Sequence, residues 1–261
     1  MDCAFRLCFI LLLSISVSSS VITSTVPSES ILQILPGNRK FGGDNGVSCE
    51  SWKFTVESND VGTWQTVPNR CQGFVKDYMT GDRYLSDSQA VADAAWSFAG
   101  NVEIAADGKD AWVFDIDETL LSNLPYYANY GFGAQGYDDA SFNAWVETEE
   151  APALPESLKI YNSLQKLGFT LFLLTGRTES QRNATEKNLL NAGYRNWEKL
   201  FLRGASDQGT LAIVYKSGKR TELEAQGYRI HGSSGDQWSD LLGKAMAKRS
   251  FKIPNPMYYI A

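Results

Sequence analysis

The sequence is poor in histidine, since its 261 residues contain only His231. A Ser-His-Asp triad, a Cys-His pair or a histidine-rich metal site would have to use that single residue. Zinc sites built from several His and Cys ligands are therefore excluded in practice. The chain carries 30 Asp and Glu residues, so we expect any catalysis to use carboxylates.

The chain also lacks an excess of positive charge. Its formal net charge is −6 and it has no stripe of Lys or Arg, which disfavours nucleic-acid binding. Hydrophobic residues make up 43% and charged residues 21% of the chain, which is the balance of a globular protein. This length is sufficient for one large domain, with or without a small insertion.

The chain has no apolar run long enough to span a membrane. The run from Leu7 to Val17 has 11 residues, whereas a spanning helix needs about 20. Arg6 precedes the run and three serines follow it, a pattern typical of a secretory signal peptide. We predict a signal peptide over residues 1–20 with cleavage at about 18–24; a membrane anchor is the alternative.

Cysteine is scarce as well, with four in the chain. Cys3 and Cys8 would leave with the signal peptide, so Cys49 and Cys71 remain as a pair in an oxidising compartment. We predict a disulfide between them, worth about 3 kcal/mol in the chain-entropy description; two buried thiols are the alternative. Asn183 opens an N-glycosylation sequon that secretion would make usable.

Patterning divides the mature chain into two parts. Residues 25–110 form a largely helical N-terminal extension: 24–47 lack periodicity, and 84–104 have helical spacing that ends before Gly108. Over 111–261, apolar runs alternate with helical patterns, which predicts a three-layer, Rossmann-like α/β fold with a parallel sheet. The predicted strands are 111–114, 169–174, 200–202 and 228–230, and the predicted helices are 158–167, 179–192, 217–225 and 237–247.

An insert over about 123–155 separates the first two strands. It is rich in aromatic residues, which form either a small satellite core, the interpretation we favour, or a cap whose rings line a substrate pocket. These residues are Tyr126, Tyr127, Tyr130, Phe132, Tyr137, Phe142 and Trp145.

The strongest chemical signal is the segment Asp115-Ile-Asp117-Glu-Thr119, at the end of the first predicted strand. Residues at i and i+2 of an extended chain lie on the same side, and open parallel sheets bind ligands at the carboxyl ends of their strands. Two neighbouring carboxylates need a proton or a cation to offset their repulsion. A hard divalent ion with oxygen ligands fits, most simply Mg²⁺.

Polar residues follow the later strands in the same way. Thr178 is placed as a helix N-cap, where backbone N–H groups bind anions such as phosphate. For the acids after the fourth strand, helix capping is the alternative interpretation. The residues are Thr175, Gly176 and Arg177 after the second strand, Lys216 at the start of the third helix, and Asp236 and Asp240 after the fourth strand.

The order of these elements resembles the haloacid dehalogenase superfamily of phosphotransferases over residues 111–242. More narrowly, nearly the whole mature chain is similar to the plant acid phosphatases related to vegetative storage proteins, a class B-like group. The segments that carry this similarity are Cys49-Glu-Ser-Trp, Asp115-Ile-Asp-Glu-Thr-Leu-Leu-Ser-Asn-Leu-Pro-Tyr-Tyr, Gly235-Asp-Gln-Trp-Ser-Asp and Pro254-Asn-Pro-Met-Tyr-Tyr-Ile.

The resemblance implies a metal-dependent acid phosphatase that hydrolyses phosphate monoesters through an aspartyl-phosphate. Asp115 would be the nucleophile, and Asp117 the general acid and then the general base. Mg²⁺ or another divalent cation would be held by the Asp115 carboxylate, the Asp117 backbone carbonyl and Asp236, with Asp240 close by.

The same resemblance implies a phosphate-binding set. Thr175 and Lys216 would hold the transferring phosphoryl oxygens, and Gly176 and Arg177 would complete the substrate site. Histidine-dependent phosphatase chemistry is not needed, so we interpret His231 as a strand-end residue with a satisfied imidazole rather than one that tunes the site.

Two functional classes remain open. The first is a secreted or vacuolar phosphatase; the second is a vegetative storage protein with little or no activity. Storage relatives typically lose the nucleophilic Asp, so the presence of Asp115 favours the enzyme. From the resemblance we also expect a vacuolar or extracellular location, including the cell wall, and a possible homodimer.

Overall fold

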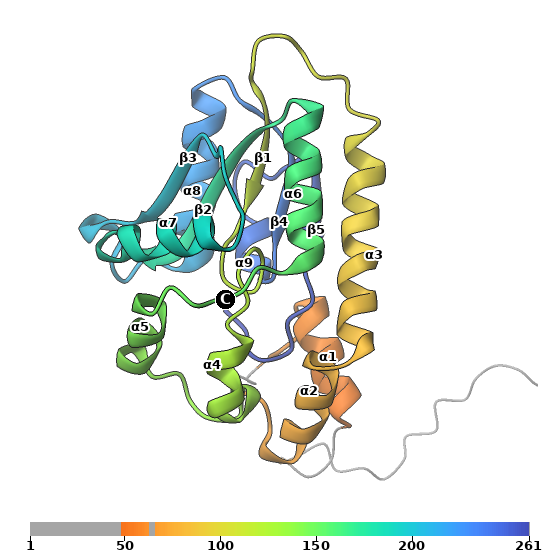
Figure 1. Cartoon of the computed structure of the whole chain (residues 1–261), viewed down its shortest axis with the longest axis vertical. Helices are drawn as coiled ribbons and strands as arrows, with labels where there is room; N and C mark the ends of the chain where they lie inside the picture. The colour runs from red at the N-terminus through yellow and green to blue at the C-terminus, as the bar shows by residue number, and fades with distance from the viewer. Residues whose placement is uncertain (1–47, 63–65, 261) are drawn as a thin grey trace, which may run out of the picture. The chain divides into compact units, whose positions relative to one another are not determined.

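The computed structural model describes residues 48–62 and 66–260, so the predicted signal peptide and the segment 24–47 lie outside the described residues. Figure 1 shows the central feature, a parallel sheet with β1 in the middle and the strand order β3-β2-β1-β4-β5. The strands are β1 (Asp110–Phe114), β2 (Thr170–Thr178), β3 (Lys199–Arg203), β4 (Arg229–Gly235) and β5 (Arg249–Lys252).

Helices cover both faces of the sheet and make three layers, as predicted (Figure 1). The alternation of side chains along β1 separates the faces: Trp112 and Phe114 pack in one apolar cluster, and Ala111 and Val113 in another. The first cluster is covered by α3 (Asp82–Ala99), α6 (Pro155–Leu167) and α7 (Arg182–Asn191), and the second by α8 (Ala212–Ala225).

Apart from the two clusters on the faces of the sheet, a further apolar core, called here the second core, joins three distant parts of the chain. These are the N-terminal helices, the aromatic insert and the C-terminal segment. Trp52, Val75, Tyr126 and Met257 are buried together in it. A disulfide joins Cys49 to Cys71, so the start of α1 is tied to the start of α2. The helices around this core are α1 (Cys49–Ser58), α2 (Gln72–Met79), α4 (Leu124–Asn129) and α5 (Asp139–Glu147).

Several predicted boundaries are wrong, and the largest errors concern the last third of the chain. The predicted strand 228–230 continues to Gly235, so His231 lies inside β4 rather than at its end. This half of the strand consists of small residues, so it has no hydrophobic pattern by which to predict it. A small residue is needed at Gly232, because a Cβ there would lie 2.4 Å from the Trp112 ring. The imidazole of His231 is satisfied, with Nε2 2.6 Å from Asp110 Oδ1.

The helical predictions need corrections as well. The helix predicted over 237–247 is only α9 (Trp238–Leu241), because Gly243 has a φ of 97° and the chain then enters β5, which was not predicted. The helix predicted over 84–104 is α3, which ends at Ala99. The helix predicted over 217–225 begins at Ala212, so Lys216 lies in the second turn of α8 and does not open it.

Short 3₁₀ turns complete the described elements, at Asn69–Cys71, Gly131–Gly133, Glu179–Gln181 and Ala205–Asp207. Thr178 caps the third of these turns with a capping box, as predicted for a helix N-cap, and α7 follows directly. Within residues 48–62 and 66–260, each helix is too short or too polar to cross a bilayer.

Candidate active site

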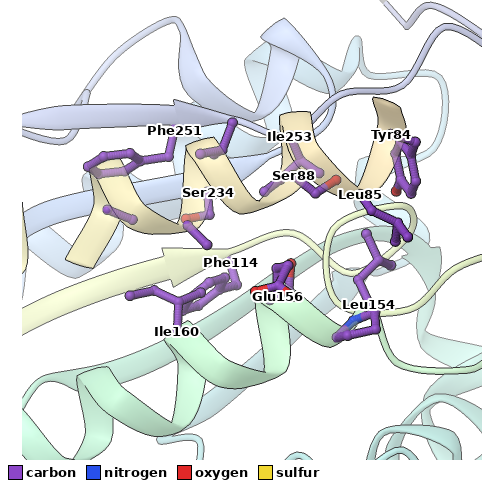
Figure 2. Close-up of a pocket in the computed structure, with 15 residues that line it drawn as sticks. Tyr84, Leu85, Ser88, Phe114, Leu154, Glu156, Ile160, Ser234, Phe251 and Ile253 are labelled. Atoms are coloured by element: carbon purple, nitrogen blue, oxygen red, sulfur yellow. The ribbon is translucent and has the colours of Figure 1, made fainter. Parts of the chain in front are cut away.

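Two cavities differ in volume and in lining, and this difference identifies the candidate site. The first, shown in Figure 2, lies between α3 and α6, has a mainly apolar lining that includes Phe114, Ile160 and Phe251, and measures about 20 Å³. It has room for about one water molecule. The second measures about 830 Å³ and is lined by charged residues, among them Asp115, which follows β1, and Lys216 of α8. Its volume is typical of small-molecule sites.

A tight turn after β1 brings two carboxylates to the larger cavity. The backbone N–H groups of Thr119, Leu120 and Leu121 all donate to the Ile116 carbonyl. Glu118 adopts a left-handed conformation with a φ of 51°, which costs energy for a residue with a side chain. The turn leaves Asp115 and Asp117 on the cavity wall.

Lys216 connects Asp115 to Asp240. Its Nζ atom donates to Asp115 Oδ1 and to Asp240 Oδ1, both at 2.5 Å, and all three side chains are buried. The position of Lys216 in the second turn of α8 places its side chain between the ends of β1 and β4. This ammonium is shared by two carboxylates, so it cannot neutralise both.

A third buried carboxylate, Asp236, completes the acidic group. Oxygens of Asp115, Asp236 and Asp240 lie within 4.8 Å of one another. These hard oxygen donors, with one ammonium among them, retain negative charge that a divalent cation would neutralise. The carboxylates of Asp115, Asp236 and Asp240 therefore fit a divalent metal site.

Burial and mutual repulsion shift the protonation of these carboxyl groups. Burial, followed by the nearby Asp240, raises the pKa of Asp115 well above its usual range. The same two causes raise the pKa of Asp236 to about 7. Burial opposes the charge of Lys216, but the carboxylates of Asp115 and Asp240 outweigh it and raise the pKa of the ammonium.

Asp117 has a different environment, because Arg177 lies against it. Arg177 Nε donates to both Asp117 oxygens at 3.1 Å, and Nη2 donates to Oδ1 at 2.7 Å. Asn123 Nδ2 also donates to Oδ1, at 2.9 Å. Burial disfavours the charged carboxylate, but the Arg177 charge and these hydrogen bonds outweigh burial and lower the pKa of Asp117.

The predicted phosphate-binding residues Thr175, Gly176 and Arg177 lie near this pair. They were predicted to follow the second strand but belong to it, because β2 continues to Thr178. Gly176 and Arg177 line the cavity. Thr175 is fully buried; its hydroxyl accepts the Arg177 N–H at 3.1 Å and lies 3.5 Å from Asp117 Oδ2. The ladder between β2 and β3 is irregular between Leu174 and Thr178, so the regular pairing ends where these polar residues begin.

At the end of β4, the Gly235 backbone packs closely against the Asp240 side chain. A Cβ on Gly235 would lie 2.4 Å from the Asp240 Cβ, so the absence of a side chain at Gly235 lets Asp240 reach Lys216. Asp240 also caps α9 by accepting the Gln237 N–H at 2.9 Å. The metal and capping interpretations of this acid are therefore compatible.

The aromatic insert forms a satellite core, the favoured interpretation, and some of its rings also line the larger cavity. Tyr126, Tyr127 and Phe132 are buried in the second core. Tyr126 and Tyr127 also line the cavity, as do Tyr130, Tyr137 and Phe142. Tyr126 stacks on Tyr130 with ring centroids 4.4 Å apart. The cap is therefore a satellite core whose outer rings face the site.

Sequence reasoning missed several polar residues that support the site. Glu118 accepts from the Asn123 backbone N–H at 2.6 Å and from the Tyr258 hydroxyl. Burial and the nearby Asp117 raise the pKa of Glu118 to about 8. Asn255 donates to Asp236 Oδ2 at 2.8 Å. All four residues lie in the segments that carry the family resemblance, which is the signal that could have identified them.

Comparison with known proteins finds a matching family and similar proteins. The family described as HAD superfamily, subfamily IIIB (acid phosphatase), matches residues 39–261. The chain is 46% identical to Acid phosphatase 1 of Solanum lycopersicum over 97% of this chain and 98% of the tomato protein. It is 35% identical to Vegetative storage protein 1 of Arabidopsis thaliana over 97% of each chain.

Among solved structures, the class C acid phosphatase of Bacillus anthracis with tungstate bound superposes with a TM-score of 0.60. The match covers 73% of this chain and 86% of the bacterial chain at 24% sequence identity. At that identity the similarity concerns the fold, which is a haloacid dehalogenase-like α/β fold with a parallel sheet.

Proposed function

The chain belongs to the HAD superfamily, subfamily IIIB acid phosphatases, and we propose that it hydrolyses phosphate monoesters with Asp115 as the nucleophile. The observation that carries this proposal is the group of three buried carboxylates around one ammonium, at the carboxyl ends of the strands. Such a group is costly unless a cation completes it, and an enzyme that uses an anionic nucleophile on an anionic substrate needs that cation.

The first step transfers the phosphoryl group to the protein. An Asp115 carboxylate oxygen attacks phosphorus, the bond to the ester oxygen breaks, and Asp117 gives its proton to that leaving oxygen. Lys216 and Arg177 offer positive charge to the phosphoryl oxygens, with Thr175 and the Gly176 backbone beside them. Mg²⁺ or another divalent cation, held by Asp115, the Asp117 carbonyl and Asp236 near Asp240, supplies charge neutralisation when bound.

The second step releases phosphate. Asp117, now a carboxylate, takes a proton from a water molecule, and the oxygen of that water attacks the phosphorus of the aspartyl-phosphate. The Asp115–phosphorus bond breaks and regenerates the free carboxylate. The hydrogen bonds from Arg177 and Asn123 hold Asp117 in one orientation for both proton transfers.

An aryl-phosphate assay tests the proposal. We expect the native protein to turn over the substrate with added Mg²⁺, to stop with EDTA, and to be inactive as Asp115→Asn. Native protein without metal-dependent turnover would favour the storage function, for which the similarity to a vegetative storage protein is the supporting observation.

We also propose that substrates with a planar aromatic leaving group react best. The cavity that contains the carboxylates is also lined by aromatic rings, including Tyr130, Tyr137 and Phe142, and rings stack on other rings. Tyr137 is 63% exposed, so truncating it should perturb the fold little. Phenyl phosphate should have a higher kcat/KM than glycerol phosphate, and Tyr137→Ala should narrow that difference; equal ratios in both proteins would reject the proposal.

The proposed location is the secretory pathway, with the vacuole or the extracellular space as destination. Asn183 is exposed on α7, where a glycan would meet solvent. Thr185 of the same sequon is buried and its hydroxyl accepts from Arg177 Nη1 at 3.2 Å. Amino-terminal sequencing and the mass lost on deglycosylation of protein from the native tissue test cleavage at 18–24 and the glycan.

A further inference from the structure

The C-terminal segment Pro254–Ile260 reaches back to the acidic group. Asn255 is fully buried, and its Nδ2 donates to Asp236 Oδ2 at 2.8 Å. Gln237 Nε2 donates to the same oxygen at 2.6 Å. Two amide groups therefore hold one oxygen of Asp236, while the other, Oδ1, has the Thr119 hydroxyl at 3.3 Å.

We propose that Asn255 is a positioning residue for the divalent cation. By holding Oδ2 of Asp236, it fixes the carboxylate rotamer and leaves Oδ1 as the oxygen available to the ion. This inference rests on the proposed function, because it concerns the metal that the proposed reaction requires. It gives a role to a segment that lies outside the strand-end motifs.

The segment is itself held from both sides. The Asn255 Oδ1 atom accepts the Met257 N–H at 3.0 Å, and Gln237 Oε1 accepts the Ile260 N–H at 2.8 Å. Gln237 therefore connects the segment to Asp236 directly.

Helix α1 supplies the second support. Glu57 Oε1 accepts the Asn255 backbone N–H at 2.9 Å, and Trp52 Nε1 donates to the Pro256 carbonyl at 2.9 Å. Glu57 also pairs with Lys252 at 2.7 Å. The N-terminal extension thus contributes to the metal site through Asn255, although none of its residues belongs to the acidic group.

The physical effect of losing Asn255 follows from burial. Without Asn255, Oδ2 of the buried Asp236 keeps only the hydrogen bond from Gln237, and the loss of a partner at a buried group is costly. The Asp236 carboxylate gains rotational freedom, and the entropic cost of ordering it then weakens cation binding. Partners of metal ligands typically contribute a factor of about 10–100 to metal affinity.

Titration calorimetry with Mg²⁺ on the full mature protein tests the proposal. Asn255→Ala should raise the Kd for Mg²⁺ by roughly 10–100-fold, with kcat largely recovered at saturating Mg²⁺. The matched control is Asn101→Ala, whose exposed amide donates to the Ser97 carbonyl at the end of α3; its Kd should equal the native value. Gln237→Leu removes the other donor to the same Asp236 oxygen and should also raise the Kd.

The outcomes separate the two proposals. If native protein binds neither Mg²⁺ nor another divalent cation, the metal-dependent function is wrong and the inference is wrong with it. If native protein binds Mg²⁺ and folded Asn255→Ala has the native Kd, the inference alone is wrong. Where Asn255→Ala does not fold, Gln237→Leu decides: a raised Kd supports the role of the amides, and a native Kd overturns it.

Discussion

Arg177 binds both carboxylate oxygens of Asp117, with contacts of 2.7–3.1 Å. The Arg177 side chain is 2% exposed and that of Asp117 19%, so water screens this pair little. The guanidinium is the main reason that the pKa of Asp117 lies below its usual range, against the effect of burial. The proposed general acid is therefore protonated, and able to donate, only at lower pH than an Asp with an ordinary pKa.

Arg177→Lys should move the basic limb of the pH profile of kcat/KM to higher pH. Lysine keeps the charge but cannot make the paired hydrogen bonds, so the pKa of Asp117 rises and its protonated form persists to higher pH. We expect a displacement of roughly one pH unit, the equivalent of one hydrogen bond to a charged group. Arg182→Lys, which alters the pairs with Glu179 and Glu186, should leave the profile unchanged. A shift of the basic limb to lower pH in Arg177→Lys would contradict the account.

Gly235→Ala should impair both stability and turnover. Its Cβ would lie 2.5 Å from Asp240 Oδ2, so Asp240 must move away from Lys216. We expect a loss of about 1–3 kcal/mol in the free energy of unfolding and a fall in kcat on the order of 100-fold. Gly218→Ala is the control, because a Cβ there has no neighbour within 4 Å; in α8 it should stabilise the protein by about 0.5–1 kcal/mol. Denaturant titrations and steady-state kinetics measure both effects. Native-like kinetics for Gly235→Ala would show that turnover does not need the close packing of Gly235 against Asp240.

The stability gained from Mg²⁺ should grow with pH. In metal-free protein, burial and Asp240 raise the pKa of Asp236 to about 7, and that of Asp115 well above its usual range. An acid with a raised folded-state pKa favours folding fully below its unfolded pKa of about 3.9, and loses that contribution as pH rises through the folded value. Protons and Mg²⁺ compete for the same oxygens. Thermal melts in EDTA should therefore show a midpoint that falls between about pH 5 and pH 8, and the increment from Mg²⁺ should be larger at the higher pH. A larger increment at the lower pH would refute this.

Loss of the disulfide should destabilise the second core. The Cys49→Ser, Cys71→Ser double variant should lose about 3 kcal/mol of unfolding free energy, because the unfolded chain regains loop entropy. A thiol reductant should lower the thermal midpoint of the native protein and have no effect on the double variant. A native midpoint that is insensitive to complete reduction would argue against this stabilising role.

The sheet could be predicted where its strands are apolar. The run 111–114 identified β1, and the positions of Asp115 and Asp117 after it followed directly. The second half of β4 was not predicted, because buried Gly232, Ser233 and Ser234 have no hydrophobic pattern. The absence of a side chain at Gly232 reflects packing against Trp112, which lies far away in sequence.

The charged residues of the site were predictable as a set, but their pairings were not. Asp236, Asp240 and Lys216 follow from strand ends and from the family resemblance. The contact of Lys216 with two carboxylates, and the contact of Asn255 with Asp236, join residues far apart in the chain. Local spacing carries no information about such contacts, which arise from the packing of α8 and the C-terminal segment onto the sheet.

Trapping the covalent intermediate tests the central claim most directly. Native protein would be quenched during turnover of an aryl phosphate with Mg²⁺, then treated with borohydride, which reduces an acyl phosphate to an alcohol. Peptide mass spectrometry should find homoserine at position 115, only when substrate is present, and should find none in Asp115→Asn. Metal-dependent turnover with an unmodified Asp115, or with the reduced residue at another position, would contradict the account.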